Sequence, residues 1–453
     1  MNQNDPHPKL SAFLSHYGMV FVLALLCAFF SFATYTVQHP AGADAAHQLA
    51  ASLIGRLGKS ARVLIAVPNQ PDADAFSDTL QAALSNAGAT VVARVKGEPK
   101  DARIALQAAA AAGRLDAIAC TQASAGWLVF ADLAADFPAL GRPLIMQPET
   151  YRWPNFLKRD NLFNIANQIA VIAIVAIGMT MVIITGGIDL SVGSLIALAA
   201  VLAALFIRDF AGAQQATAPG MVLACTGAVL IAGGAGAVSG AMVTVFHLPP
   251  FIVTLAMMLV ASGAAYLLTH GQSVYQVPDS FIWLGRGADW FGIPNAVLLM
   301  ALLYLAAHLV MSRTVLGRYI YAVGGNRLAA RFSGVPVRRV LFLSYVVSGL
   351  LAGLGGVVLA SQLKSGSPTF GQMYELYVIA AVVVGGASLS GGTGRMFGTL
   401  IGALIIAVIQ NGMNLMNVES YTQKVVLGLV ILGAVMLDLL RHRGWRLQLS
   451  ATE

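Results

Sequence analysis

Long runs of apolar residues are the feature that most restricts how this chain can fold. Each of about ten runs is close to the 20 residues that an α-helix needs to cross a lipid bilayer. Of the 453 residues, 57% are hydrophobic and 10% are charged, whereas ordinary soluble domains have about 25% charged residues. The fold is therefore predicted to be mainly α, a polytopic transmembrane helical bundle of about ten spans. We expect the spans at residues 17–37, 162–185, 190–208, 220–246, 250–269, 294–312, 339–361, 375–391, 396–415 and 422–440.

A polar segment separates the first two of these spans. Charged residues return from about residue 39 to residue 150 and alternate with short apolar runs. Strands that alternate with helices predict an inserted α/β domain, in which βαβ units build a parallel sheet. The predicted strands are residues 62–67, 90–95, 117–120 and 143–147, and the predicted helices are residues 72–87, 100–112 and 123–137.

Arginine residues predict which side of the membrane each segment faces. The loop from Ser312 to Val340 is rich in arginine and contains no acidic residue, and more arginines follow residue 440. Because short basic loops remain in the cytoplasm, the inserted domain is expected on the outer side. The predicted domains are a cytoplasmic N-terminus (1–16), the first span (17–37), the inserted extracytoplasmic α/β domain (38–153), the main transmembrane domain (154–444) and a cytoplasmic tail (445–453).

A polar turn at residues 184–194, ITGGIDLSVGS, lies between two apolar runs. It places the Asp189 carboxylate at or near membrane depth, where a charge is costly unless it has partners. Two compatible interpretations follow. Asp189 caps the next helix by accepting backbone N–H bonds from Ser191 or Val192, or it belongs to a path or gate through the membrane.

Residues 385–391, GGASLSG, repeat the Gly-Gly-x-x-Leu-Ser pattern of this turn. Both segments lie at predicted inner turns between adjacent spans, and they are either related structural corners or independent glycine turns. Glu375 is the other acidic residue near a span, and we expect it at the outer start of a helix, as a cap or an interface carboxylate. Small-residue pairs inside spans predict close helix packing: Gly236 with Gly240, Gly349 with Gly353, and Gly398 with Gly402.

The spans contain few ionisable residues, which argues against a carrier driven by an ion gradient. Ion-driven carriers usually need buried acids or unwound coordinating segments. A neutral polar solute, moved by energy from outside this chain, is therefore favoured. Gly58-Lys59-Ser60 is not a nucleotide-binding loop, because Leu53 occupies the position of its first glycine, and no other Walker-type loop occurs in the chain.

The remaining composition argues against several other classes of function. Cys27, Cys120 and Cys225 form no closely spaced pair, so they indicate neither a disulfide framework nor a metal cluster. The net charge of +7 is explained by basic inner loops and requires no nucleic-acid partner. We expect no cofactor and no enzymatic activity of the chain's own.

The inner basic loop contains the segment YAVGGNRLAARFSGV at residues 321–335. Positive-inside anchoring accounts for its arginines. Its Gly-Gly-Asn turn, followed by Ala-Ala-x-x-x-Gly, predicts a short helix that is capped by Asn326 and available for docking.

Four segments in sequence resemble permease subunits of bacterial ATP-binding-cassette (ABC) sugar importers of the ribose, xylose and galactoside group. The resemblance covers about residues 154–444 and implies a multi-pass protein of the bacterial inner membrane, surrounded by lipid. It also implies a pore of two permeases, either two copies or two paralogues, with ATPase subunits inside and a periplasmic sugar-binding protein outside. The four segments are GMTMVIITGGIDLSVGS (178–194), PPFIVTLAMM (249–258), YAVGGNRLAARFSGV (321–335) and GGASLSGGTGRMFGTLIGALIIAVIQNGMNLM (385–416).

The matching segments supply the candidate functional residues. Leu328 stands where glutamate is common in such permeases, so ATPase docking is expected to lose one charged contact. Candidates for the translocation path or its gate are Gly186, Gly187, Asp189, Ser191, Pro250, Phe251, Thr254, Asn411 and Asn414. Candidates for ATPase coupling, within residues 324–334, are Gly324, Gly325, Asn326, Ala329, Ala330, Arg331 and Gly334.

Such permeases usually lack the inserted domain, and residues 62–120 resemble one lobe of a sugar-binding protein. Asn69 would lie on the edge where such lobes face their ligand. One lobe cannot enclose a sugar by hinge closure, so we favour a docking or accessory role over low-affinity solute capture or a structural relic. For the whole chain, the competing hypotheses are a membrane receptor for a small molecule and an ion-coupled sugar carrier. The sequence identifies neither the sugar nor the composition of the dimer.

Overall fold

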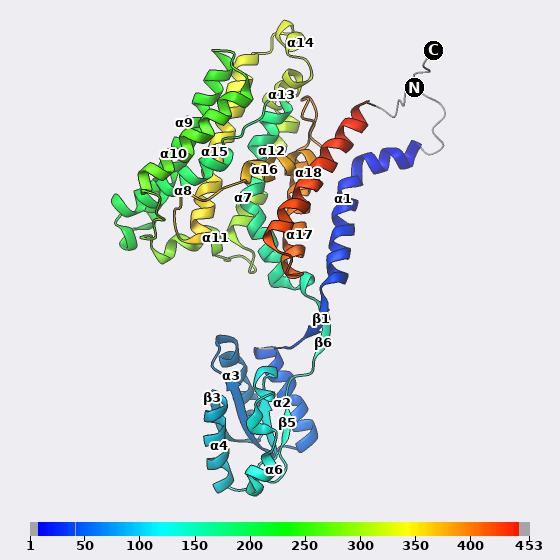
Figure 1. Ribbon diagram of the computed structural model, residues 1–453, viewed down its shortest axis with the longest axis vertical. Coiled ribbons are helices and arrows are strands. Elements are labelled where there is room, and N and C mark those ends of the chain that lie inside the picture. Colours follow the sequence, from blue (N-terminus) through cyan, green and yellow to red (C-terminus); the bar gives the residue numbers. More distant parts are fainter. Residues whose placement is uncertain (1–7, 41, 444–453) are drawn as a thin grey trace. The chain divides into compact units, whose positions relative to one another are not determined.

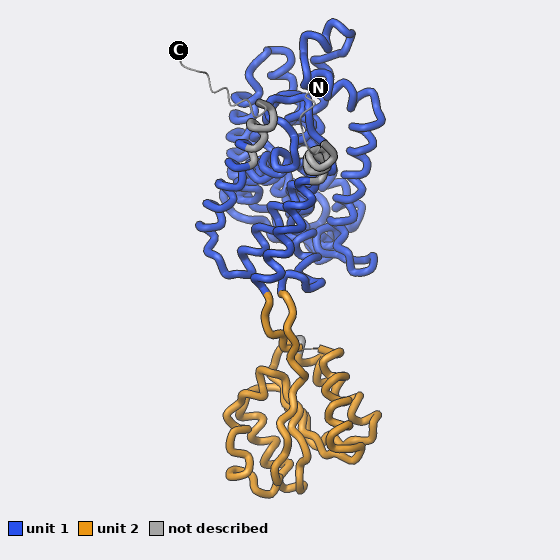
Figure 2. The backbone as a smooth tube through the Cα atoms, turned by 90° about the vertical axis from the view of Figure 1, so that its right-hand side faces the viewer, with its two compact units in different colours: residues 1–34, 155–453 blue, residues 35–154 orange. Residues whose placement is uncertain are grey.

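The computed structural model describes residues 8–40 and 42–443, which form two compact units (Figure 2). The membrane unit contains the described residues up to Thr34 and from Asn155 onward, and the α/β unit is Tyr35–Pro154. The predicted tail, residues 445–453, lies outside the described residues, as do residues 1–7 of the predicted N-terminal segment.

A four-stranded parallel sheet forms the centre of the α/β unit, as the alternation of strands and helices predicts. The strands lie in the order β3-β2-β4-β5, so that β2 and β4 are central, and their side chains are mostly buried. The elements are β2 (Arg62–Pro68), α3 (Pro71–Asn86), β3 (Thr90–Gly97), α4 (Pro99–Ala111), β4 (Ala117–Cys120) and β5 (Leu144–Met146).

The helix predicted at residues 123–137 is wrong, because the chain there forms short pieces. These are α5 (Gln122–Ala125), a 3₁₀ turn at Leu128–Phe130 and α6 (Leu133–Asp136). Trp127 has extended backbone angles, φ −66° and ψ 129°, which interrupt the helix between the first two pieces.

Three further elements of the α/β unit are absent from the prediction. Helix α2 (Ala43–Leu57) buries Ala46, Leu49 and Leu53 on one face, but its many alanines and polar residues give only a weak apolar pattern. Strand β1 (Tyr35–Gln38) pairs in antiparallel fashion with β6 (Tyr151–Pro154). This ribbon brings the two ends of the α/β unit together.

Seven helices of the membrane unit are long and apolar enough to cross a membrane, and they match seven of the predicted spans. Helix α7 is the most enclosed, and α15 packs against α7, α8 and α9 (Figure 1). The seven are α7 (Arg159–Ile184), α8 (Val192–Asp209), α9 (Ala218–Thr244), α10 (Pro250–Thr269), α12 (Asn295–Arg313), α15 (Val337–Leu363) and α17 (Met396–Leu415).

The other predicted spans correspond to shorter apolar helices, so the total of about ten spans stays a prediction. Their apolar parts are Gly18–Ala33 within α1 (Pro8–Ala33), the whole of α16 (Tyr374–Val384), and Ser420–Gly433 within α18 (Ser420–Arg443). Helix α1 ends before residue 37, the predicted end of the first span, because Tyr35 already belongs to β1.

The continuous span predicted at residues 375–391 is wrong. Helix α16 has 11 residues and ends at Val384, which gives a length of about 16 Å at 1.5 Å per residue. Before it, the chain from Lys364 to Met373 is not helical and runs along α8. Gly366 lies against Ala200 and Gly371 against Gly193, with no space for a side chain at either glycine.

The predicted close packing at small residues is confirmed. A Cβ atom on Gly349 of α15 would lie 2.5 Å from the Ala232 carbonyl oxygen of α9 and 3.0 Å from the Gly236 Cα atom. On α17, a Cβ atom on Gly402 would overlap the Ala381 carbonyl oxygen of α16. These contacts bring helix backbones together without intervening side chains.

Candidate functional site

The corner after α7 is a tight glycine turn. Gly186 has φ +76°, its N–H donates to the Ile183 carbonyl (2.9 Å), and the Gly187 N–H donates to the Val182 carbonyl (3.0 Å). This is the Schellman pattern, in which a glycine in the left-handed region ends a helix. The turn redirects the chain toward Asp189 and the start of α8.

Asp189 is 1% exposed and joins this corner to α15. Its Oδ1 atom accepts from the Ser191 N–H (3.0 Å) and hydroxyl (2.6 Å), and its Oδ2 atom accepts from the Ser348 hydroxyl (2.7 Å). None of the ion pairs in the described chain involves Asp189. Hydroxyl and amide donors therefore satisfy this buried carboxylate.

The prediction that Asp189 caps the next helix is confirmed only in part. The predicted bond from the Ser191 N–H is present. However, α8 begins at Val192 with Ser191 as its N-cap residue, so Asp189 lies two residues too early to be the cap itself. Its bond to Ser348, 159 residues away, has no signal in the local sequence.

The second glycine corner, after α16, closes in the same way. Gly386 has φ +90°, and the N–H groups of Gly386 and Ala387 donate to the Val383 and Val382 carbonyls. Downstream, the Ser390 N–H donates to the Ser388 hydroxyl (3.3 Å), as the Ser191 N–H does to Asp189. The two repeated sequences thus form similar corners.

The two corners meet the predicted coupling segment. The Gly392 N–H donates to the Ile184 carbonyl (2.8 Å) at the end of α7. A Cβ atom on Gly324, in α13 (Val315–Gly325), would overlap that same Ile184 oxygen. The Arg327 guanidinium donates to the Thr185 carbonyl (3.0 Å). Three segments that are far apart in sequence therefore share one junction.

The short helix in the coupling segment is α14 (Arg327–Phe332), and its predicted cap is confirmed because the Asn326 side chain accepts from the Ala329 N–H (3.0 Å). Leu328 and Phe332 are 68% and 89% exposed, which gives α14 an apolar outer surface. Among the other predicted coupling residues, Ala330 is buried, whereas Gly325, Ala329, Arg331 and Gly334 are exposed.

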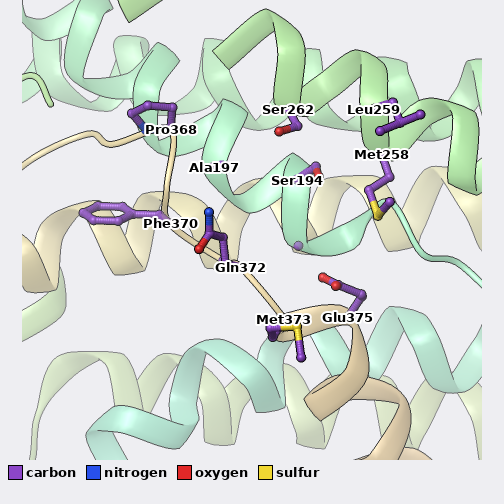
Figure 3. Close-up of a pocket in the computed structure, with 12 residues that line it drawn as sticks. Ser194, Ala197, Met258, Leu259, Ser262, Pro368, Phe370, Gln372, Met373 and Glu375 are labelled. Carbon is purple, nitrogen blue, oxygen red and sulfur yellow. The ribbon is translucent and has the colours of Figure 1, made fainter. Parts of the chain in front are cut away.

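A cavity of about 280 Å³ lies beside the start of α8 and α16 (Figure 3). Glu375 lies in the first turn of α16 here, and its carboxylate lies where a Cβ atom on Gly193 would be. The 364–373 segment brings the start of α16 beside the start of α8, and the outer position of Glu375 stays a prediction. The lining combines polar and apolar side chains: Ser194 and Ala197 from α8; Met258, Leu259 and Ser262 from α10; and Pro368, Phe370, Gln372, Met373 and Glu375.

The predicted path residues separate into two places. Thr254 lies at the Asp189 corner, because its hydroxyl donates to the carbonyls of Ile188 (3.3 Å) and Pro250 (3.0 Å). Pro250 is the first residue of α10, and Phe251 beside it is 53% exposed.

Asn411 and Asn414 lie at the far end of α17, away from the corner. Asn411 exchanges two amide hydrogen bonds with Asn161 (2.8 and 3.0 Å), and Asn414 accepts from Gln423 (2.7 Å). In the α/β unit, Asn69 follows β2 and is exposed at the carboxyl edge of the sheet. Whether these residues contact a solute stays a prediction.

The cavity residues between Pro368 and Glu375 are missing from the predicted site. The sequence KSGSPTFGQM contains two glycines and a proline, which are unfavourable in a helix, and it carries the only signal of a break. That signal is easily taken for an ordinary loop between two spans.

Comparison with known proteins identifies the architecture. Residues 161–435 match the protein family described as "Branched-chain amino acid transport system / permease component". The chain belongs to this permease family. It is a multi-pass inner-membrane transport subunit. The family match begins after the α/β unit, which lies entirely outside it.

Several sugar permeases are similar to this chain. The ribose import permease RbsC of Escherichia coli K12 is 46% identical over 289 residues, which are 63% of this chain and 87% of the relative. RbsC of Bacillus subtilis 168 is 44% identical over 286 residues, 63% and 86% of the two chains. The L-arabinose permease AraH of E. coli K12 is 36% identical over 293 residues, 65% and 87% of the two chains. No solved structure matches this chain.

Proposed function

We propose that this permease carries a monosaccharide or a similar neutral polar solute inward, by alternating access driven by a separate ATPase. The observation that carries this proposal is the cavity at the break before α16. Ser194, Ser262, Gln372 and Glu375 offer hydroxyl, amide and carboxylate groups for the hydroxyls of a sugar, and Phe370 offers an aromatic face. Ribose and L-arabinose, the sugars named for two of its relatives, belong to this chemical class.

The broken helix supports a transport role on physical grounds. Non-helical backbone at membrane depth is tolerated where protein buries it or where it lines a cavity. Transporters often build solute sites from such discontinuous helices. The segment before α16 meets both conditions, since it packs on α8 and lines the cavity.

The junction of the two glycine corners and α14 supports coupling to an ATPase on the cytoplasmic side. The exposed Leu328 and Phe332 side chains form an apolar contact surface, and Arg331 beside them supplies a charge. Since Leu328 replaces the glutamate common in such permeases, this contact is more apolar than usual. Force on α14 reaches α7 through Gly324 and Arg327.

The domain arrangement is part of the same proposal. It has about ten spans, with the α/β unit inserted between the first and second on the periplasmic side. The paired ends of the unit, β1 and β6, support insertion into a loop, because both chain connections leave from one ribbon. We assign this unit an accessory role in docking the sugar-binding protein. The pore requires a second permease, either a copy or a paralogue.

Reconstitution tests the proposal. The chain is placed in lipid vesicles with its candidate ATPase and binding protein, and uptake of labelled ribose and arabinose is measured. We expect uptake that needs ATP and all three components. Uptake that persists without the ATPase and follows a proton gradient would identify an ion-coupled carrier instead. Deletion of residues 42–150 in the same assay should weaken the affinity for the binding protein.

A further inference from the structure

The Tyr345 hydroxyl is a buried group without a hydrogen-bond partner in the described part of the chain. Tyr345 lies on α15 and is 0% exposed. Buried polar groups in native proteins are nearly always paired, so each exception calls for an explanation such as a functional role. Tyr304 on α12, also buried, has the usual arrangement, since its hydroxyl donates to the Ala173 carbonyl (3.0 Å).

The unpaired hydroxyl faces the Asp189 corner. A Cβ atom on Gly187 would lie 2.5 Å from the Tyr345 oxygen, so this glycine provides the space that the hydroxyl occupies. Tyr345 also precedes Ser348 by three residues, which puts both on one face of α15. Ser348 is the residue of α15 that donates to Asp189.

Asp189 has capacity for another donor. An ionised carboxylate offers about four acceptor positions. The described donors to Asp189 are the Ser191 N–H, the Ser191 hydroxyl and the Ser348 hydroxyl. A donor from α15 can therefore be added or exchanged at this carboxylate.

Helix α15 also follows the coupling segment directly in the chain. Only residues 333–336 separate it from α14, so a displacement of α14 acts on α15 through the chain itself. The Arg327 guanidinium of α14 also donates a hydrogen bond to the Thr185 carbonyl at the corner after α7. A movement of α14 can therefore act both on α15, which carries Tyr345 and Ser348, and on the corner that carries Asp189.

We propose that Tyr345 is a positioning residue, whose hydroxyl replaces Ser348 as the donor to Asp189 in the other access state of the transporter. This inference rests on the proposed transport function. The two residues are about 4.5 Å apart along the helix axis, a shift of the size known for one-turn movements between packed helices. The released Ser348 hydroxyl can bond to the carbonyl four residues before it, as the Ser344 hydroxyl already does with Val340 (3.0 Å).

The test compares Tyr345→Phe with Tyr304→Phe in the reconstituted transporter. Each variant removes one buried hydroxyl and keeps the ring. Melting temperature and the amount of sugar transported per ATP hydrolysed are measured for both. We expect Tyr304→Phe to lower the melting temperature and leave the sugar-to-ATP ratio within twofold of wild type. Tyr345→Phe should keep or raise the melting temperature and lower the ratio at least about fivefold.

Two results would overturn this inference alone. One is a wild-type sugar-to-ATP ratio in Tyr345→Phe, which would make the hydroxyl a tolerated unpaired group. The other is a lower melting temperature in Tyr345→Phe with the ratio unchanged, which would indicate a structural bond like that of Tyr304. Absence of ATP-driven uptake by the wild-type transporter would overturn the transport proposal together with it.

Discussion

The Ser348 hydroxyl on α15 donates a 2.7 Å hydrogen bond to the Asp189 carboxylate, joining residues that are 159 positions apart. Through this bond, the helix that follows the coupling segment holds the corner before α8. Because α8 also lines the cavity, the bond connects the candidate coupling junction with the candidate solute site.

Replacement of Asp189 separates its hydrogen-bonding role from its charge. In Asp189→Asn, the amide oxygen can still accept from Ser191, so we expect uptake within a few-fold of wild type. Asp189→Ala leaves buried donors unpaired, at a cost of about 1–3 kcal/mol each, and should lower both melting temperature and uptake. Complete loss of uptake in both variants, with folding retained, would show that the charge itself acts in transport.

Two adjacent glycines of the coupling segment should respond oppositely to alanine. Gly324→Ala forces a methyl group into the Ile184 carbonyl, whereas a Cβ atom on Gly325 meets nothing within 4 Å. We expect Gly324→Ala to destabilise the junction by about 1–3 kcal/mol, an overpacking cost, and Gly325→Ala to be nearly neutral. Thermal unfolding of the two purified variants measures this difference. Equal melting temperatures would contradict the packing of α13 against α7.

The apolar surface of α14 predicts how the ATPase binds. Phe332→Ala removes a side chain that is 89% exposed, so the permease should fold normally, while binding of the ATPase weakens by about tenfold. Phe291→Ala is the matched control, since Phe291 is 85% exposed and lies in the loop before α12. Titration of the ATPase onto permease in nanodiscs gives both affinities. Comparable weakening in the two variants would argue against α14 as the docking surface.

The α/β unit has a titrating group that should limit its stability in alkali. Burial raises the pKa of Cys120 to about 12 from its ordinary value of 9.0. At a pH between these two pKa values, the Cys120 thiol loses its proton in the unfolded protein and keeps it in the folded protein. Stability should therefore fall as pH rises from about 9 to 12, by up to about 1.4 kcal/mol per pH unit. Cys120→Ala should remove this slope when unfolding is followed against pH, and an unchanged slope would assign the effect to another group.

The sequence predicts the helices of the membrane unit well because each long apolar run is a local signal. Seven of the spans follow from such runs alone. The break before α16 agrees with the predicted start of a span at residue 375, but its packing against α8 escapes prediction. The apolar character of Val378–Val384 says nothing about where that helix starts in the membrane. Lys364–Met373 is held by contacts with α8, residues more than 150 positions away, and those contacts have no local pattern.

The turn that contains Asp189 was predictable from the sequence, but the residues that contact this turn from α15 were not. Gly186, Asp189 and Ser191 stand out from their apolar surroundings, and Asn326 marks the start of α14 by ordinary capping chemistry. Ser348 and Tyr345 look like unremarkable residues of an apolar helix. Their importance depends on α15 lying beside the corner, which only the tertiary packing determines.

Blocking the cavity tests the central claim most directly. Ser262 of α10 lines the cavity, while the next residue, Gly263, has open space around its Cβ position. ATP-driven uptake of labelled ribose should be compared in vesicles that contain wild type, Ser262→Phe or Gly263→Phe. We expect Ser262→Phe to abolish uptake and retain ATPase binding, and Gly263→Phe to transport like wild type. Undiminished uptake by a well-folded Ser262→Phe transporter would contradict a solute path through this cavity.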